Sequence, residues 1–160
     1  MAKIRAFFEK ILATVVVTIV AALAAVVVVG VAFRKAGAAL VWYDEVAAIL
    51  LAWLTYYGAA LVALRRGHIG VPVLVERLQG GARTVAVLTG EAAVVGFFVV
   101  LAWAGLQVQA ALAGVPLVSL PGVPTALAQS VIPIGAVLFV IAQLLSLPDA
   151  LRGEVGSGDQ

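Results

Sequence analysis

The sequence lacks cysteine, contains one histidine, and has few charged residues. Without cysteine the chain can form neither a disulfide nor a thiolate metal site, and one isolated histidine is not enough for a zinc site, so we expect no metal or other cofactor. Only 11% of the 160 residues are charged, whereas 64% are hydrophobic and the mean hydropathy is +1.19. A soluble domain does not need so apolar a composition, and the sequence therefore predicts an integral membrane protein.

Motifs of common enzyme classes are also missing. The sequence contains no phosphate-cradling glycine loop, no HExxH motif, and no serine with a histidine base in reach. The net charge of +2 and the pI near 9.3 are weak grounds for nucleic-acid binding. Ten Lys and Arg residues in a membrane protein are better explained as signals that set its topology. We therefore expect neither an enzyme nor a nucleic-acid-binding protein.

Four apolar segments are long enough to cross a bilayer. Residues 11–33 contain no charge. As a helix rising about 1.5 Å per residue, this segment is longer than the thickness of the hydrocarbon core, about 30 Å. The basic residues before this segment imitate a signal peptide, but its apolar run is too long for one, which favours an uncleaved helix. The other spans are expected at about 46–64, 84–111 and 127–147. Pro133 lies near the start of the last span, where a proline is tolerated in the first helical turn.

These spans predict an all-α membrane protein with one four-helix domain over residues 1–153 and a disordered tail at 154–160. If both termini are cytoplasmic, eight of the ten Lys and Arg residues lie on the cytoplasmic side, and the positive-inside rule predicts that orientation. On this side, Pro72 and an amphipathic pattern predict a short interfacial helix between the second and third spans. The outer connection at 114–130 has three prolines and no charge. We expect it on the outer membrane surface or against another subunit.

The second span begins with two adjacent carboxylates in the sequence WYDE. At about 100° per residue, Asp44 and Glu45 point in different directions, and we expect Asp44 to stay in the outer headgroup layer. Trp42 and Tyr43 lie where aromatic belts occur. The face of Glu45 carries mainly small residues, which mark close helix approach, and the opposite face carries leucines that we expect to face lipid. Glu45 is thus predicted to be a structural contact between helices or subunits, with a partner that this chain need not contain. The residues of this face are Ala48, Ala52, Thr55, Tyr56 and Ala59, and the leucines opposite are Leu50, Leu54 and Leu61.

Two further polar residues are candidates for function. Glu91 in the third span is predicted to lie in the leaflet opposite Glu45, which argues against the two glutamates acting as one acid/base pair. We expect Glu91 to form an ion pair at the cytoplasmic side, and a proton or cation relay is the alternative. His68 is expected to bind backbone carbonyls or lipid headgroups, and a pH switch is the alternative. The possible ion-pair partners of Glu91 are Arg65, Arg66 and Arg83.

Several of these stretches together resemble a known family. The WYDE tetrapeptide followed by YYGAALVALRRGHIGV, Tyr56 to Val71, is similar to the signature of the small membrane subunit, the Q component, of the tripartite ATP-independent periplasmic (TRAP) transporters. The later SLPGVP and VIPIGAVLF resemble the final span of that family. Length, four spans and orientation also agree. One departure is Pro72, which stands where the family often has an aspartate.

The resemblance implies a scaffold subunit in the bacterial inner membrane. In such a system a periplasmic binding protein delivers an organic anion of carboxylate type to a large permease subunit, which imports it with sodium. The substrate and sodium sites would then lie in the large subunit. We expect the first two spans of this chain to contribute most of the contact with that subunit, and the uncharged outer connection to pack on its periplasmic side. The alternatives are a self-contained small membrane enzyme or homo-oligomeric ion pathway using Glu45, Glu91 and His68, and a sensor or assembly factor.

Overall fold

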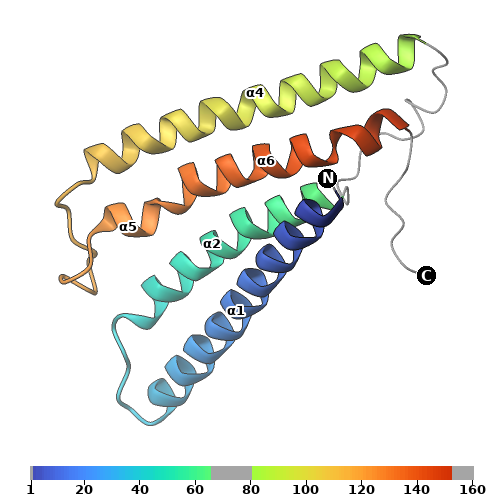
Figure 1. The fold of residues 1–160 in the computed structure, drawn as a ribbon. Helices are drawn as coiled ribbons and strands as arrows, with labels where there is room; N and C mark the ends of the chain where they lie inside the picture. Colours follow the sequence, from blue (N-terminus) through green and yellow to red (C-terminus); the bar gives the residue numbers. More distant parts are fainter. Residues whose placement is uncertain (1, 66–80, 153–160) are drawn as a thin grey trace.

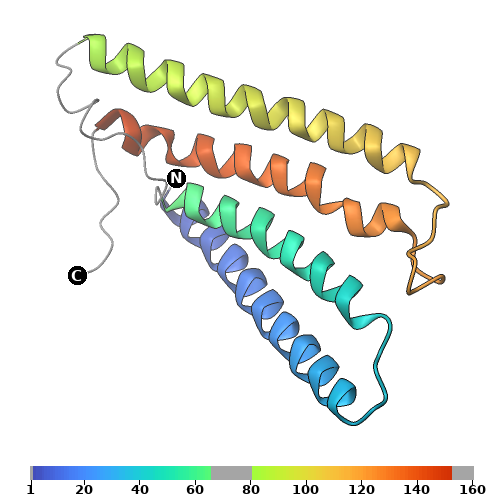
Figure 2. The same cartoon turned by 180° about the vertical axis from the view of Figure 1, so that it is seen from behind.

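A computed structural model of the chain describes residues 2–65 and 81–152 (Figures 1 and 2). This part of the chain is helical and contains no β-strand, and four of its helices are long and apolar enough to span a membrane. The predicted all-α membrane fold with four spans is therefore confirmed. The four long helices are α1 (Ala2–Lys35), α2 (Tyr43–Leu64), α4 (Gly81–Ala111) and α6 (Val131–Arg152), and the short helix α5 (Thr125–Gln129) precedes α6.

Several predicted features fall outside the described residues. The interfacial helix expected after Pro72 and the expected tail at 154–160 lie there, as do Arg66 and His68. These expectations stay predictions.

The fourth predicted span consists of two helices, α5 and α6, rather than one. Pro133 lies in the first turn of α6, as expected, and its ring would collide with the carbonyl of Gln129 in a continuous helix. Helix α5 accordingly ends at Gln129, and the chain turns at Ser130 before α6 begins. A single proline thus explains both the end of α5 and the start of α6.

The long helices lie in an open row rather than in a closed bundle (Figures 1 and 2). Helix α2 packs between α1 and α6, and α4 packs on the other side of α6. The order across the row is therefore α1, α2, α6, α4. Helix α6 is the most buried of the four, whereas α4 buries only Gly105 among its residues. A single layer of helices leaves both of its faces open to the surroundings.

The two ends of the row differ in which helix termini and connections they contain. The start of α1, the start of α4 and the last turns of α2 and α6 lie at one end, which we call the inner end after the predicted topology (Figure 1). The connection between α1 and α2, residues 36–42, and the connection between α4 and α5, residues 112–124, lie at the outer end (Figure 1).

The buried core lies where α1, α2 and α6 approach one another near the inner end. Its members are apolar residues of these three helices, and Phe98 of α4 stacks on Phe139 of α6 with ring centroids 3.7 Å apart. Among the described residues, three glycines at helix crossings leave no room for a Cβ atom. On Gly105 of α4, a Cβ atom would lie 2.8 Å from Cγ2 of Ile132 in α6. A Cβ atom on Gly135 of α6 would lie 2.6 Å from the Cβ of Tyr56 in α2, and one on Gly30 of α1 would collide with the ring of Tyr43. The core residues are Leu12, Ala60, Ala63, Leu64, Phe139 and Ala142.

Candidate functional site

The side chain of Glu45 links α2 to the connection between α4 and α5. The backbone N–H of Ser119 donates to Glu45 Oε2 at 2.7 Å, and the N–H of Val118 donates to Glu45 Oε1 at 3.2 Å. Each carboxylate oxygen therefore accepts one hydrogen bond from two successive residues of the connection. The partner of Glu45 lies in this chain, more than 70 residues away. Of the two possibilities left open for Glu45, a contact between helices or one between subunits, this bond is of the first kind.

The connection is folded into a compact turn that presents these two N–H groups. The N–H of Leu117 donates to the carbonyl of Val123 at 2.9 Å, and the N–H of Thr125 donates to the carbonyl of Val115 at 2.8 Å. Gly114 has φ of 88°, a left-handed conformation that favours glycine and turns the chain after α4. The Glu45 carboxylate therefore binds a loop whose shape is largely set by its own backbone bonds.

Two aromatic residues of α2 also make contacts between helices. The indole N–H of Trp53 donates to the carbonyl of Ala128 in α5 at 3.0 Å, which gives α2 a second link to this region. Tyr43 is buried against α1, so it fills a helix crossing, and its place in an aromatic belt stays a prediction. Its neighbour Trp42 is half-buried at the start of α2.

The small-residue face of α2 is largely uncovered by this chain. Ala48, Ala52 and Thr55 are exposed, so no helix of the described part of this chain covers them, and the close helix approach expected at this face stays a prediction. Leu61, which we expected to face lipid, packs against the core instead. The physical reason is that α2 packs between α1 and α6 and buries the sides that meet them. The buried residues of α2 are Tyr43, Ala60, Ala63 and Leu64; Tyr56 and Ala59 are half-buried.

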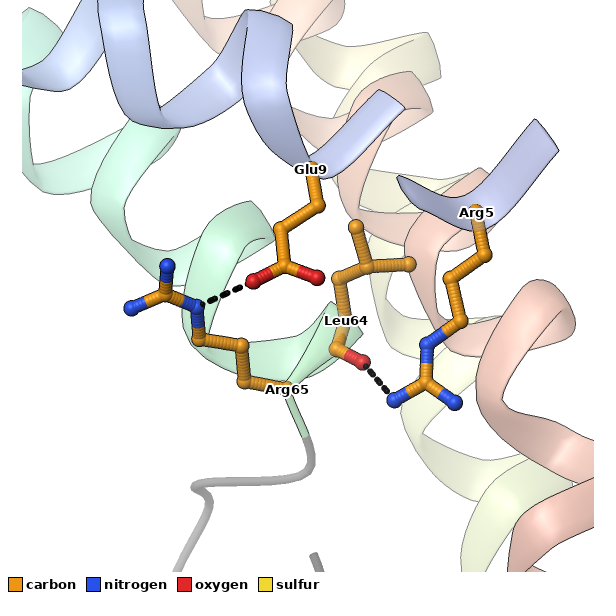
Figure 3. Close-up of polar contacts among 4 residues, drawn as sticks. All are labelled: Arg5, Glu9, Leu64 and Arg65. Carbon is orange, nitrogen blue, oxygen red and sulfur yellow. Dashed lines mark hydrogen bonds and ion pairs between the residues drawn. The ribbon is translucent and has the colours of Figure 1, made fainter. Parts of the chain in front are cut away.

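At the inner end, charged residues of α1 contact the last turn of α2 (Figure 3). Arg5 donates from Nη2 to the carbonyl of Leu64 at 2.9 Å, which satisfies one of the carbonyls that a helix end leaves free. The guanidinium Nε of Arg65 pairs with Glu9 Oε1 at 2.8 Å. Because this ion pair is partly exposed, it contributes about 0–1 kcal/mol. Sequence reasoning missed Arg5 and Glu9, although their spacing of four places them on one helix face.

Glu91 links α4 to α6. The side-chain amide of Gln143 donates from Nε2 to Glu91 Oε2, and the Ser146 hydroxyl donates to the carbonyl of Gln143 at 3.0 Å. This contact connects α4 to the neighbour against which it packs, whereas Glu45 binds the connection at the outer end. The two glutamates therefore have separate partners. The expected ion pair of Glu91 with an arginine stays a prediction, and Arg65 itself pairs with Glu9.

Substitutions of Glu91 and of its partner Gln143 distinguish a structural role of Glu91 from a role in a proton or cation relay. In Glu91→Gln, the amide oxygen still accepts a hydrogen bond from Gln143, so we expect a stable fold and undiminished function. Gln143→Leu removes the donor, and we expect it to lower the free energy of unfolding by about 0.6 kcal/mol, and by at most about 1.7 kcal/mol. Thermal unfolding in detergent measures both effects, with Gln107→Leu at an exposed position of α4 as the matched control. Loss of function in Glu91→Gln with unchanged stability would contradict this role.

The contacts described so far hold helices and connections together. In residues 2–65 and 81–152 no group of three or more His, Asp or Glu residues is arranged to hold a metal ion. Arg5, Glu45, Trp53 and Gln143 form hydrogen bonds that cross from one helix to another helix or to the outer connection. Chemically, this arrangement can fix the positions of the helices and of the outer connection.

The fold defines a multi-pass α-helical membrane protein, and several of its polar side chains link neighbouring helices or the outer connection. The chain matches a family model described as "Tripartite ATP-independent periplasmic transporters, DctQ component" over residues 23–153. It belongs to this family, which supplies the small subunit of TRAP transporters, and the family expected from the sequence is confirmed. A comparison with curated proteins gives no match.

Proposed function

We propose that this chain is the scaffold subunit of a sodium-coupled TRAP transporter in the bacterial inner membrane. In this proposal it binds beside a large permease subunit, which carries the substrate and sodium sites. A periplasmic binding protein delivers the substrate, an organic anion of carboxylate type. Membership of the DctQ family supports a transport role and implies these two partner components.

The observation that carries the scaffold role is the open row of helices. A transport path through a membrane protein has to be enclosed by protein, because polar backbone and solutes are not tolerated in contact with lipid. The four long helices in the described part of the chain form one layer, and a single layer encloses no interior (Figures 1 and 2). This supports the proposal that the transported substrate passes through the large subunit.

The small-residue face of α2 indicates where the large subunit could bind this chain. Helices in membranes associate where small residues let their backbones approach closely. Ala48, Ala52 and Thr55 are exposed in this chain, so its own helices leave them available for such an approach. We propose that this face, together with half-buried Ala59, contacts the large subunit, while Trp42, Glu45 and Tyr56 beside it hold α2 in place within this chain. Cytoplasmic termini are part of the proposal and follow from the positive-inside rule.

Co-purification of the two subunits tests this proposal. The chain is expressed with its large permease subunit, a tag on the permease is used for purification in mild detergent, and the small chain is expected to co-purify. Introducing bulk with Ala48→Leu and Ala52→Leu together should abolish co-purification, whereas Ala93→Leu on the exposed surface of α4 is the matched control. Failure of the unmodified chain to co-purify would overturn the scaffold role. Full co-purification of the double variant would overturn only the assignment of this face.

A further inference from the structure

We propose that the connection between α4 and α5, residues 112–124, inserts into the lipid leaflet at the outer end, with the Val118 side chain in contact with lipid. Glu45 holds the connection at that depth. The partner of this surface is therefore the bilayer itself. The inference rests on the membrane-spanning fold and on contacts within this chain, and it holds whether or not a large subunit binds.

The first argument concerns depth in the membrane. Arg65 follows Glu45 by 20 residues along α2, which is about 30 Å at about 1.5 Å per residue and equals the thickness of the hydrocarbon core. With the Arg65 guanidinium at the headgroups of one leaflet, the Glu45 carboxylate lies at the hydrocarbon boundary of the other. Because the N–H groups of Val118 and Ser119 bind Glu45 directly, the turn of the connection lies at that same boundary.

The second argument concerns the backbone of the connection. A loop at membrane depth must satisfy its backbone N–H groups within the protein, since lipid offers no partner. Residues 114–125 include three prolines, which have no N–H group, and six of the other nine residues donate theirs within the chain. The donors are Val115, Leu117, Val118, Ser119, Val123 and Thr125.

The third argument concerns the exposed side chains. Val118 is 92% exposed and Val115 is 45% exposed, although both are apolar. No charged residue occurs between Glu91 and Asp149, so the connection has no charge of its own. Its apolar surface continues from the exposed apolar side chains of the last turns of α4, including Leu106 at 56% exposure. Surfaces that dock a soluble protein reversibly carry charges that steer association, and this connection carries none.

The absence of cysteine from the sequence makes a site-specific test direct. Single cysteines are introduced as Val118→Cys, as Ala38→Cys in the α1–α2 connection beside Lys35, and as Val100→Cys in the middle of α4. The full chain is reconstituted in phosphatidylethanolamine/phosphatidylglycerol nanodiscs, and each thiol is reacted with a charged, membrane-impermeant maleimide. The same cysteines are also spin-labelled, and their collisions with oxygen and with a water-soluble nickel chelate are measured.

We expect Val118→Cys to react with the charged maleimide about tenfold more slowly than Ala38→Cys, because a charged reagent is costly to bring to the hydrocarbon boundary. The spin label at 118 should collide more with oxygen than with the nickel chelate, as the label at 100 does. Reaction at the rate of Ala38→Cys, or preferential collision with the nickel chelate, would overturn the inference. The label at 118 could also be shielded from both oxygen and the nickel chelate, but only when a large subunit is present. That result would overturn the inference and assign the loop to a protein interface.

Discussion

Glu45→Leu is expected to release the connection between α4 and α5 from α2 and to reduce substrate uptake by the transporter severalfold. The variant leaves the N–H groups of Val118 and Ser119 without their acceptors. An N–H group without an acceptor at membrane depth is unfavourable, so the connection has to rearrange. Because the proposed substrate site lies in the large subunit, substrate preference should stay unchanged. Uptake into proteoliposomes that contain the complex measures the effect.

Two matched variants sharpen this expectation. Glu45→Gln keeps one carbonyl oxygen and so accepts from only one of the two N–H groups well, and its defect should be smaller than that of Glu45→Leu. Asp44→Asn alters the neighbouring carboxylate, which is exposed and lies 4.0 Å from Arg34, so it should have little effect. A spin label at position 118 should become more mobile in Glu45→Leu and not in Asp44→Asn. Normal uptake together with an immobile label in Glu45→Leu would refute the role of Glu45.

Gly135→Ala is expected to destabilise the packing of α2 on α6. The new Cβ atom would lie 2.6 Å from the Cβ of Tyr56, and a Cβ atom cannot rotate away as the end of a side chain can. The two helices must therefore move apart, at a cost of about 1–3 kcal/mol, which is typical of overpacking. Gly135→Leu should be more damaging still. Thermal unfolding in detergent, followed by tryptophan fluorescence, measures the loss.

Gly58 offers the matched control for this substitution. It lies on α2, and a Cβ atom there would meet nothing within 4 Å. Gly58→Ala should therefore leave the chain as stable as before, or stabilise it by up to about 1 kcal/mol through the better helix propensity of alanine. If Gly135→Ala were as stable as Gly58→Ala, the close contact between α2 and α6 would not exist in the protein.

The sequence was most informative where structure depends on local composition. The lengths and apolarity of the four segments predicted the spans, since the bilayer sets the length of an apolar helix. Pro133 was expected near the start of the last span, because a proline is tolerated in the first helical turn. The same proline also ends α5 at Gln129, and that break was not anticipated. The small residues around Glu45 on α2 were found by helical phase. Helical phase could not tell whether these small residues lie against this chain or against another chain.

The sequence by itself determined the membrane class, the number of spans and the family, because hydropathy and short motifs belong to contiguous residues. Only the tertiary structure decided the order α1, α2, α6, α4 across the row and the bond between Glu45 and residues 118–119. The partner of Glu45 is a pair of backbone N–H groups, which every residue except proline carries, so no side-chain pattern could reveal it. The open row follows from which helix faces meet. The sequence could not predict those faces, because all four helices are apolar around most of their circumference.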